Sequence, residues 1–111
     1  MRRKNFKGRC EKIHISKSKE VCRLYDPIQR AYLSILEQDA FILEIRCNVP
    51  LTGLEYMTDF VCKKNNSELM VRECVFRKYI TKPMTIKLLD ESREYWLNHG
   101  VSDWGIIINE E

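Results

Sequence analysis

The spacing of apolar and polar residues changes several times along the chain, and each change predicts a secondary-structure element. Residues 26–38 have the apolar spacing of one helix face. Alternating stretches follow at 41–49, 55–62 and 69–76, and a polar turn at 63–67 joins the last two. Helical spacing returns at 81–99, and the apolar run at 104–109 predicts a strand buried on both faces. The predicted order is helix, three strands, helix, strand.

The first predicted helix has a clear start signal. Asp26 is a suitable N-cap, Pro27 takes the first helical position, and Gln29 stands where the third member of a capping box is found. We therefore expect Gln29 to serve the cap. The residues expected to face the core are Ile28, Ala31, Tyr32, Ile35 and Leu36 in this helix and Ile86, Leu89, Arg93, Trp96 and Leu97 in the second.

Strands and helices in this order predict a single small α/β domain, in which a mixed sheet is flanked by both helices. The second helix would connect the third strand to a parallel last strand in a right-handed crossover. A chain of 111 residues has room for one such core, and 44% hydrophobic with 32% charged residues is typical of a globular protein. No apolar run reaches the ~20 residues of a membrane span. Five cysteines without a close pair, and no secretory signal, argue against a zinc site and predict reduced thiols in the cytoplasm.

Charge is distributed unevenly. Residues 1–30 hold ten Lys or Arg and three acids, a net charge of +7, and the other 81 residues carry −4, which gives +3 overall. We expect residues 1–25 to form a basic N-terminal arm on a domain of residues 26–111. Such an arm is typical of phosphate-backbone binding, and a solvated tail is the alternative. The expected DNA-binding residues are Arg2, Arg3, Lys4, Lys7, Arg9, Lys12, Lys17 and Lys19.

Two acids stand where the strand alternation requires apolar residues. Glu73 falls on the same face as Val75 in the third strand, and Asp59 shares a face with Val61 in the second. A buried carboxylate costs several kcal/mol unless a partner or a cation offsets it. Because the two strands form a hairpin, the acids would lie side by side, and a divalent ion would relieve their repulsion. The alternative is a structural ion pair for each acid, for example Glu73 with Arg46.

Five segments within residues 16–109 resemble the sequence of a known protein family. They are YDPIQRAYLSILEQD, IRCNVP, TDF, LMVREC and SREYWLNHGVSDWGIIIN. With this order of elements, the chain resembles the restriction-endonuclease-like nucleases of the PD-(D/E)xK superfamily. More specifically, it resembles the N-terminal nuclease domain of TnsA, the endonuclease subunit of Tn7-type heteromeric transposases. The resemblance implies a restriction-endonuclease-like core of order α-β-β-β-α-β.

The resemblance also implies a catalytic site. Asp59 matches the motif aspartate and Glu73 the acid of the E-x-K motif, and with the backbone carbonyl of Cys74 they would bind Mg²⁺ or Mn²⁺. The family's helix glutamate falls at Gln29, and its lysine falls at Val75, which has no charge with which to stabilise a transition state. Lys78 is the expected catalytic replacement, and Arg77 would share the face of Glu73 if the strand continued.

The implied function is metal-dependent endonuclease cleavage of double-stranded DNA at transposon ends, during DNA transposition in the bacterial cytoplasm and nucleoid. The implied partners are a DDE-family transposase subunit and an ATPase regulator. One alternative is a catalytically degenerate nuclease fold that serves as a DNA-binding or assembly subunit. A second alternative is a small interaction protein with purely structural acids.

Overall fold

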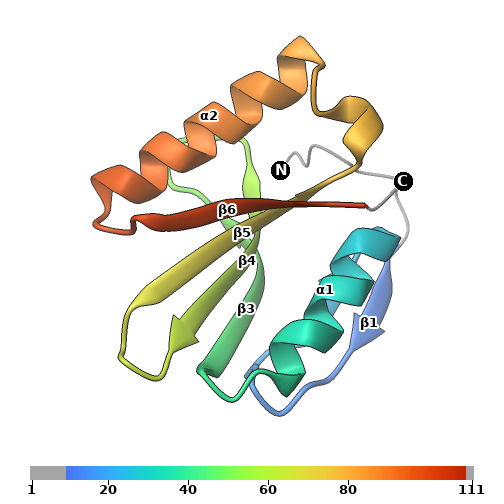
Figure 1. The fold of residues 1–111 in the computed structure, drawn as a ribbon, viewed down its shortest axis with the longest axis vertical. Helices are drawn as coiled ribbons and strands as arrows, with labels where there is room; N and C mark the ends of the chain where they lie inside the picture. The colour runs from blue at the N-terminus through green and yellow to red at the C-terminus, as the bar shows by residue number, and fades with distance from the viewer. Residues whose placement is uncertain (1–9, 110–111) are drawn as a thin grey trace.

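A mixed four-stranded sheet with a helix on each face forms the body of the protein (Figure 1). The structure is a computed structural model, and it describes residues 10–109. The sheet order is β3-β4-β5-β6, with antiparallel pairs except for the parallel pair β5–β6. The predicted α/β class is therefore confirmed. The elements of the body are β3 (Ile42–Pro50), β4 (Met57–Lys64), β5 (Leu69–Val75), β6 (Asp103–Ile108), α1 (Pro27–Gln38) and α2 (Pro83–Asn98).

Alternating residues of the central strands supply two apolar cores. Phe60 and Cys62 of β4 face α1, whereas Val61 between them packs with residues of α2. The same alternation separates Met70 from Val71 in β5. Because successive strand residues point to opposite faces, each helix covers one face of the sheet. Neither helix is long and apolar enough to cross a lipid bilayer within the described residues.

The helix α1 starts as the sequence predicts, but its buried face is rotated. Asp26 caps it by accepting a hydrogen bond from the amide of Gln29 at 2.8 Å, and Pro27 is the first helical residue. The prediction that Ala31 and Ile35 face the core is wrong, since both are exposed. Gln29, a polar residue, takes the second buried position, so the apolar spacing indicated a different helix face. The buried residues of α1 are Ile28, Gln29, Leu33 and Leu36.

A similar rotation occurs in α2. The predicted core positions Ile86 and Leu97 are exposed, at 45% and 47%, and Arg93 is exposed as well. Two buried hydroxyl residues interrupt the apolar stripe, so the periodicity indicated a neighbouring face instead. Leu89 and Trp96 are buried as predicted. The buried residues of α2 are Thr85, Leu88, Leu89, Ser92 and Trp96.

The last strand pairs in parallel with β5, as predicted, but it is not buried on both faces. Five of its six residues are partly exposed and Ile106 is 37% exposed, because β6 lies at the end of the sheet order. Two ion pairs hold its first residue: Asp103 lies 2.8 Å from Lys64 and 2.8 Å from Arg72. These cations hold the pKa of the Asp103 carboxyl below its usual value, with the hydrogen bond from Lys64 as the larger cause.

A small antiparallel pair that the sequence did not predict precedes α1. β1 (Glu11–Ile13) pairs with β2 (Cys22–Leu24), and each strand is too short to show a clear period of two. Ile15, Cys22 and Leu24 are buried in the core on the α1 face. Residues 10–25, which fall within the expected arm, therefore pack on the domain.

Lys17 closes the C-terminal end of α1. Its ammonium group donates to the carbonyl of Leu36 at 3.2 Å and to that of Asp39 at 2.8 Å. The last carbonyls of a helix lack partners within the helix, and a cation stabilises them. The amide of Ile45 donates to the carbonyl of Lys17 at 2.9 Å, which fixes this loop to β3. The side chain that charge alone assigned to DNA thus has a structural role.

Candidate functional site

Asp59 and Glu73 lie on the neighbouring strands β4 and β5, and both have an exposed fraction of 0%. The backbone pairing of the two strands runs from Lys63–Leu69 to Phe60–Arg72. One further step in this antiparallel register places Asp59 opposite Glu73. The two acids are therefore adjacent on neighbouring strands, and their carboxylates bind opposite helices: Asp59 contacts Gln29 of α1 and Glu73 contacts Ser92 of α2.

Each of the four carboxylate oxygens accepts a hydrogen bond. Oδ1 of Asp59 accepts from the side-chain amide of Gln29 at 2.6 Å, and Oδ2 accepts from the backbone amide of Cys74 at 2.7 Å. Oε1 of Glu73 accepts from the backbone amide of Asp59 at 3.1 Å, and Oε2 accepts from the hydroxyl of Ser92 at 2.6 Å. These four donors are neutral, so they stabilise the carboxylates without cancelling their charge.

Gln29 joins α1 to this pair. Its side-chain oxygen accepts a hydrogen bond from the backbone amide of Tyr25 at 2.6 Å, which serves the start of the helix as expected. Its side-chain nitrogen reaches Asp59 and lies 3.5 Å from the amide oxygen of Asn48. The contact with Asp59 was missed because the capping box gave Gln29 a sufficient role. A polar residue inside the buried stripe of α1 was the available signal.

A hydroxyl and indole cluster lies behind Glu73 on the α2 face. The indole of Trp104 donates to Ser92 at 3.2 Å, and the indole of Trp96 donates to Thr58 at 2.9 Å. Ser92 and Thr58 are wholly buried, and their hydroxyl oxygens are 3.5 Å apart. Sequence reasoning missed both residues. The sequence does contain a signal for each: Ser92 is a small polar residue at a core position of α2, and Thr58 is one beside Asp59 in β4.

The position at which the resemblance implies a lysine carries no charge in this chain. Val75 has an exposed fraction of 0% and pairs with Ile108 of β6. Beyond β5 the chain turns into a short 3-10 helix, η1 (Arg77–Tyr79), so the strand does not extend to Arg77. The ammonium of Lys78 lies 5.1 Å from the ring centre of Tyr79 and 5.9 Å from that of Phe76. These aromatic contacts give Lys78 a defined position just after the strand that carries Glu73.

The chemistry of the donor set fits a hard divalent cation, since adjacent carboxylates and a backbone carbonyl are ligands that Mg²⁺ prefers. Asp59 and Glu73 supply the carboxylates, and Cys74 follows Glu73 directly in β5. Within residues 10–109, no group of three or more His, Cys, Asp or Glu side chains is arranged to hold a metal ion. Such a site would therefore have two carboxylates and would draw further ligands from water or substrate.

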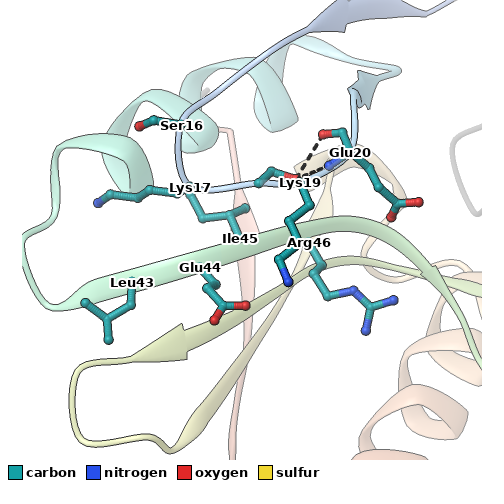
Figure 2. A pocket seen from close by; sticks show the side chains of 9 residues that line it. Ser16, Lys17, Lys19, Glu20, Leu43, Glu44, Ile45 and Arg46 are labelled. Carbon is teal, nitrogen blue, oxygen red and sulfur yellow. Dashed lines mark hydrogen bonds between the residues drawn. The ribbon is translucent and has the colours of Figure 1, made fainter.

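Two basic residues of the described part of the expected arm, Lys17 and Lys19, line one hollow, and the side chain of Lys17 is directed away from it to the end of α1 (Figure 2). This hollow, of 460 Å³, lies between residues 16–20 and β3, and its lining includes Lys19 and Arg46 together with Glu20 and Glu44. The mixed charge gives it no clear preference for phosphate. Arg46, the expected partner of Glu73 in the ion-pair alternative, is exposed at this hollow.

The expected DNA-binding residues fall into two groups, those that the structure describes and those outside the described residues. Lys12 and Lys19 are exposed, and Lys17 is occupied at the end of α1. Five further residues lie outside the described residues. They are Arg2, Arg3, Lys4, Lys7 and Arg9.

Comparison of the sequence with models of known protein families gives no match, and comparison with curated proteins gives none either.

Proposed function

We propose that this protein is a metal-dependent DNA endonuclease subunit with a restriction-endonuclease-like core similar to that of TnsA. The observation that supports this proposal most is the pair of wholly buried carboxylates, Asp59 and Glu73, adjacent on neighbouring strands. Buried acids in adjacent positions are costly for a fold, and they are characteristic of sites with a chemical task. The contact of Gln29 with Asp59 adds support, because it lies where the resemblance expects a helix residue of the site.

In this proposal, Asp59, Glu73 and the backbone carbonyl of Cys74 hold Mg²⁺ or Mn²⁺. When bound, the ion supplies polarisation of a DNA phosphodiester and activation of a water molecule. Gln29 orients the carboxylate of Asp59 from one side, and Ser92 orients that of Glu73 from the other. Lys78 is the proposed catalytic replacement for the missing lysine, with its ammonium group stabilising negative charge on the phosphate.

The proposed substrate is double-stranded DNA at a transposon end, cut together with a DDE-family transposase subunit under control of an ATPase. The basic residues before α1 would contact phosphates without selecting a sequence. The proposed location is the bacterial cytoplasm, at the nucleoid when DNA is bound.

A second candidate is a DNA-binding and assembly subunit that has lost nuclease activity. Two observations favour it: Val75 is wholly buried at the lysine position, and every oxygen of the two carboxylates already accepts a hydrogen bond from the protein. In this case the acids organise the centre of the sheet, and the basic segment retains the phosphate contacts.

Cleavage of plasmid DNA that carries transposon ends separates the two candidates. The full chain is incubated with Mn²⁺ or Mg²⁺, alone and with the transposase subunit, and nicking and salt-dependent DNA binding are measured. Asp59→Asn and Glu73→Gln should abolish nicking, and Glu94→Gln, on the exposed face of α2, is the matched control that should retain it. Binding without nicking in the presence of metal and transposase would establish the second candidate. Absence of both activities would rule out both.

A further inference from the structure

Two thiols that play no part in the proposed nuclease site lie in direct contact. The thiol of Cys47 donates a hydrogen bond to the sulfur of Cys22, with 2.7 Å between the two Sγ atoms. Cys22 belongs to β2 and Cys47 to β3, so the contact joins the small N-terminal sheet to the edge of the main sheet. Both cysteines have free thiols.

The pair is accessible from one side only. Cys22 is 1% exposed, whereas Cys47 is partly exposed and lines a surface hollow of 650 Å³. The polar residues of that hollow include Ser18, Arg23 and Asn48. A small polar oxidant can therefore reach Cys47 from solvent, and Cys22 lies directly behind Cys47.

The contact also changes the acidity of the two thiols. The hydrogen bond from Cys47 lowers the pKa of Cys22 to about 7, against the opposing effect of burial. The pKa of Cys47 is raised, first because its proton is held in that hydrogen bond and second because of burial. Since the thiolate is the reactive form of cysteine, this pair holds a thiolate at neutral pH more readily than an isolated cysteine does.

We propose that Cys22 and Cys47 form a redox-active dithiol site, which a peroxide-class oxidant converts to a disulfide between β2 and β3. The Cys47 proton passes along the hydrogen bond to the Cys22 thiolate, and the accessible Cys47 sulfur attacks one oxygen of hydrogen peroxide, which gives a sulfenic acid and releases hydroxide. The hydroxide takes the proton from Cys22, whose thiolate then attacks the Cys47 sulfur and displaces the second hydroxide. Each hydroxide takes up a thiol proton as water, so two thiols are oxidised and one peroxide is reduced to two waters. Cellular thiols would reverse the step by disulfide exchange.

The other cysteines lack this combination of proximity and access. Cys62 is wholly buried, and burial raises its pKa to about 12, which makes it a poor nucleophile. Cys74 is also wholly buried and donates its backbone amide to Asp59. Cys10 is exposed, and it precedes β1. Oxidation should therefore select the Cys22–Cys47 pair within one chain.

The disulfide would tie the root of the basic N-terminal segment to the main sheet. It would close a covalent loop that contains all of α1, and a cross-link of this kind stabilises a fold by restricting its unfolded state. We expect the melting temperature of the oxidised chain to be higher by about 10 °C. This inference does not depend on the proposed nuclease function.

The test is oxidation of the folded full chain with hydrogen peroxide, followed by alkylation, trypsin digestion and mass spectrometry. The expected product links the peptide Glu20–Arg23 to the peptide Cys47–Lys63 and is lighter than the separate peptides by two hydrogen atoms. The second peptide also contains Cys62. The Cys62→Ala chain therefore identifies the bonded sulfur, and it should form the same link as the natural sequence.

Cys22→Ser and Cys47→Ser should each lose the link, the rise in melting temperature and the loss of two titratable thiols. Cys10→Ser is the matched control and should retain all three. The proposal is overturned if Cys22 remains unlinked in the folded natural chain, if the link goes to Cys62 or Cys10, or if it forms equally fast in urea. Reversal by dithiothreitol separates the disulfide from irreversible oxidation, and failure to reverse would also overturn it.

Discussion

The backbone amide of Asp59 donates a hydrogen bond to the side-chain carboxylate of Glu73, with 3.1 Å between donor and acceptor. In return, the amide of Cys74 donates to the carboxylate of Asp59 at 2.7 Å. Backbone pairing of β4 with β5 extends to Phe60–Arg72, and beyond it these side-chain hydrogen bonds hold the two strands together. The two acids are thus part of the link between the strands as well as candidates for chemistry.

Replacing the Asp59 carboxylate should cost more stability when the hydrogen-bond acceptors are removed than when only the charge is removed. Asp59→Ala leaves the buried donors of Gln29 and Cys74 without this acceptor, at about 1–3 kcal/mol for each donor. Asp59→Asn retains one acceptor oxygen and should be destabilised less. The free energy of unfolding in urea measures both. If Asp59→Ala unfolds at the same urea concentration as the natural chain, these hydrogen bonds contribute no net stability.

Gln29→Glu should make the stability of the domain dependent on divalent metal. It places a third carboxyl group beside Asp59, so repulsion should lower the melting temperature in EDTA, and Mg²⁺ should restore it. A ligand at 100 times its dissociation constant stabilises by about 2.7 kcal/mol. Gln38→Glu, at the exposed end of the same helix, is the control and should respond little to Mg²⁺. An equal response of both variants would show that the ion acts on the general surface charge.

Val75→Lys tests the proposed active site by placing a lysine where the proposed resemblance expects one. If the lysine reaches a phosphate bound at Asp59 and Glu73, nicking should increase by ~10²–10³-fold, the size of one transition-state donor. Because Val75 is wholly buried, the variant should also be less stable without DNA. Val75→Met has similar length without charge and serves as the control for packing. A folded Val75→Lys chain that shows no nicking with metal and transposase would contradict the catalytic proposal.

The ion pairs at the start of β6 should contribute stability that depends on pH. Lys64 and Arg72 lower the pKa of Asp103 in the folded state, so its contribution is complete above the unfolded pKa, near 3.9, and is lost as pH falls through the folded value. Asp103→Asn should therefore reduce the melting temperature by roughly 2–5 °C at pH 6. The two proteins should converge as pH falls through the lowered pKa of Asp103 in the folded state. A difference that is independent of pH would indicate a packing effect of the substitution.

Sequence periodicity predicted the six main elements, because helices of 12 and 16 residues and a long hairpin extend over several periods. It failed where a buried polar residue interrupts an apolar stripe. Gln29 in α1 and Ser92 in α2 shifted the inferred faces away from the true ones. Both residues are buried because they bind the acids of the site, so the errors in the fold and the omissions in the site have one cause.

The sequence singled out Asp59 and Glu73 because a charge on the inner face of a strand is unusual. It could not give their partners, since hydrogen bonds across 30 and 19 residues depend on how the helices dock. The charge pattern likewise could not show where each basic side chain lies in the fold. Lys17 contributes to the basic count, yet its ammonium group is bound to the end of α1.

The path of hydrogen bonds from Gln29 through Asp59 and Glu73 to Ser92 crosses the sheet and connects its two helical layers. The two acids therefore anchor α1 and α2 to the same point of the sheet, although the helices lie on opposite faces. Each acid also bonds to the backbone of the strand that carries the other, so a substitution at either one would loosen the docking of both helices.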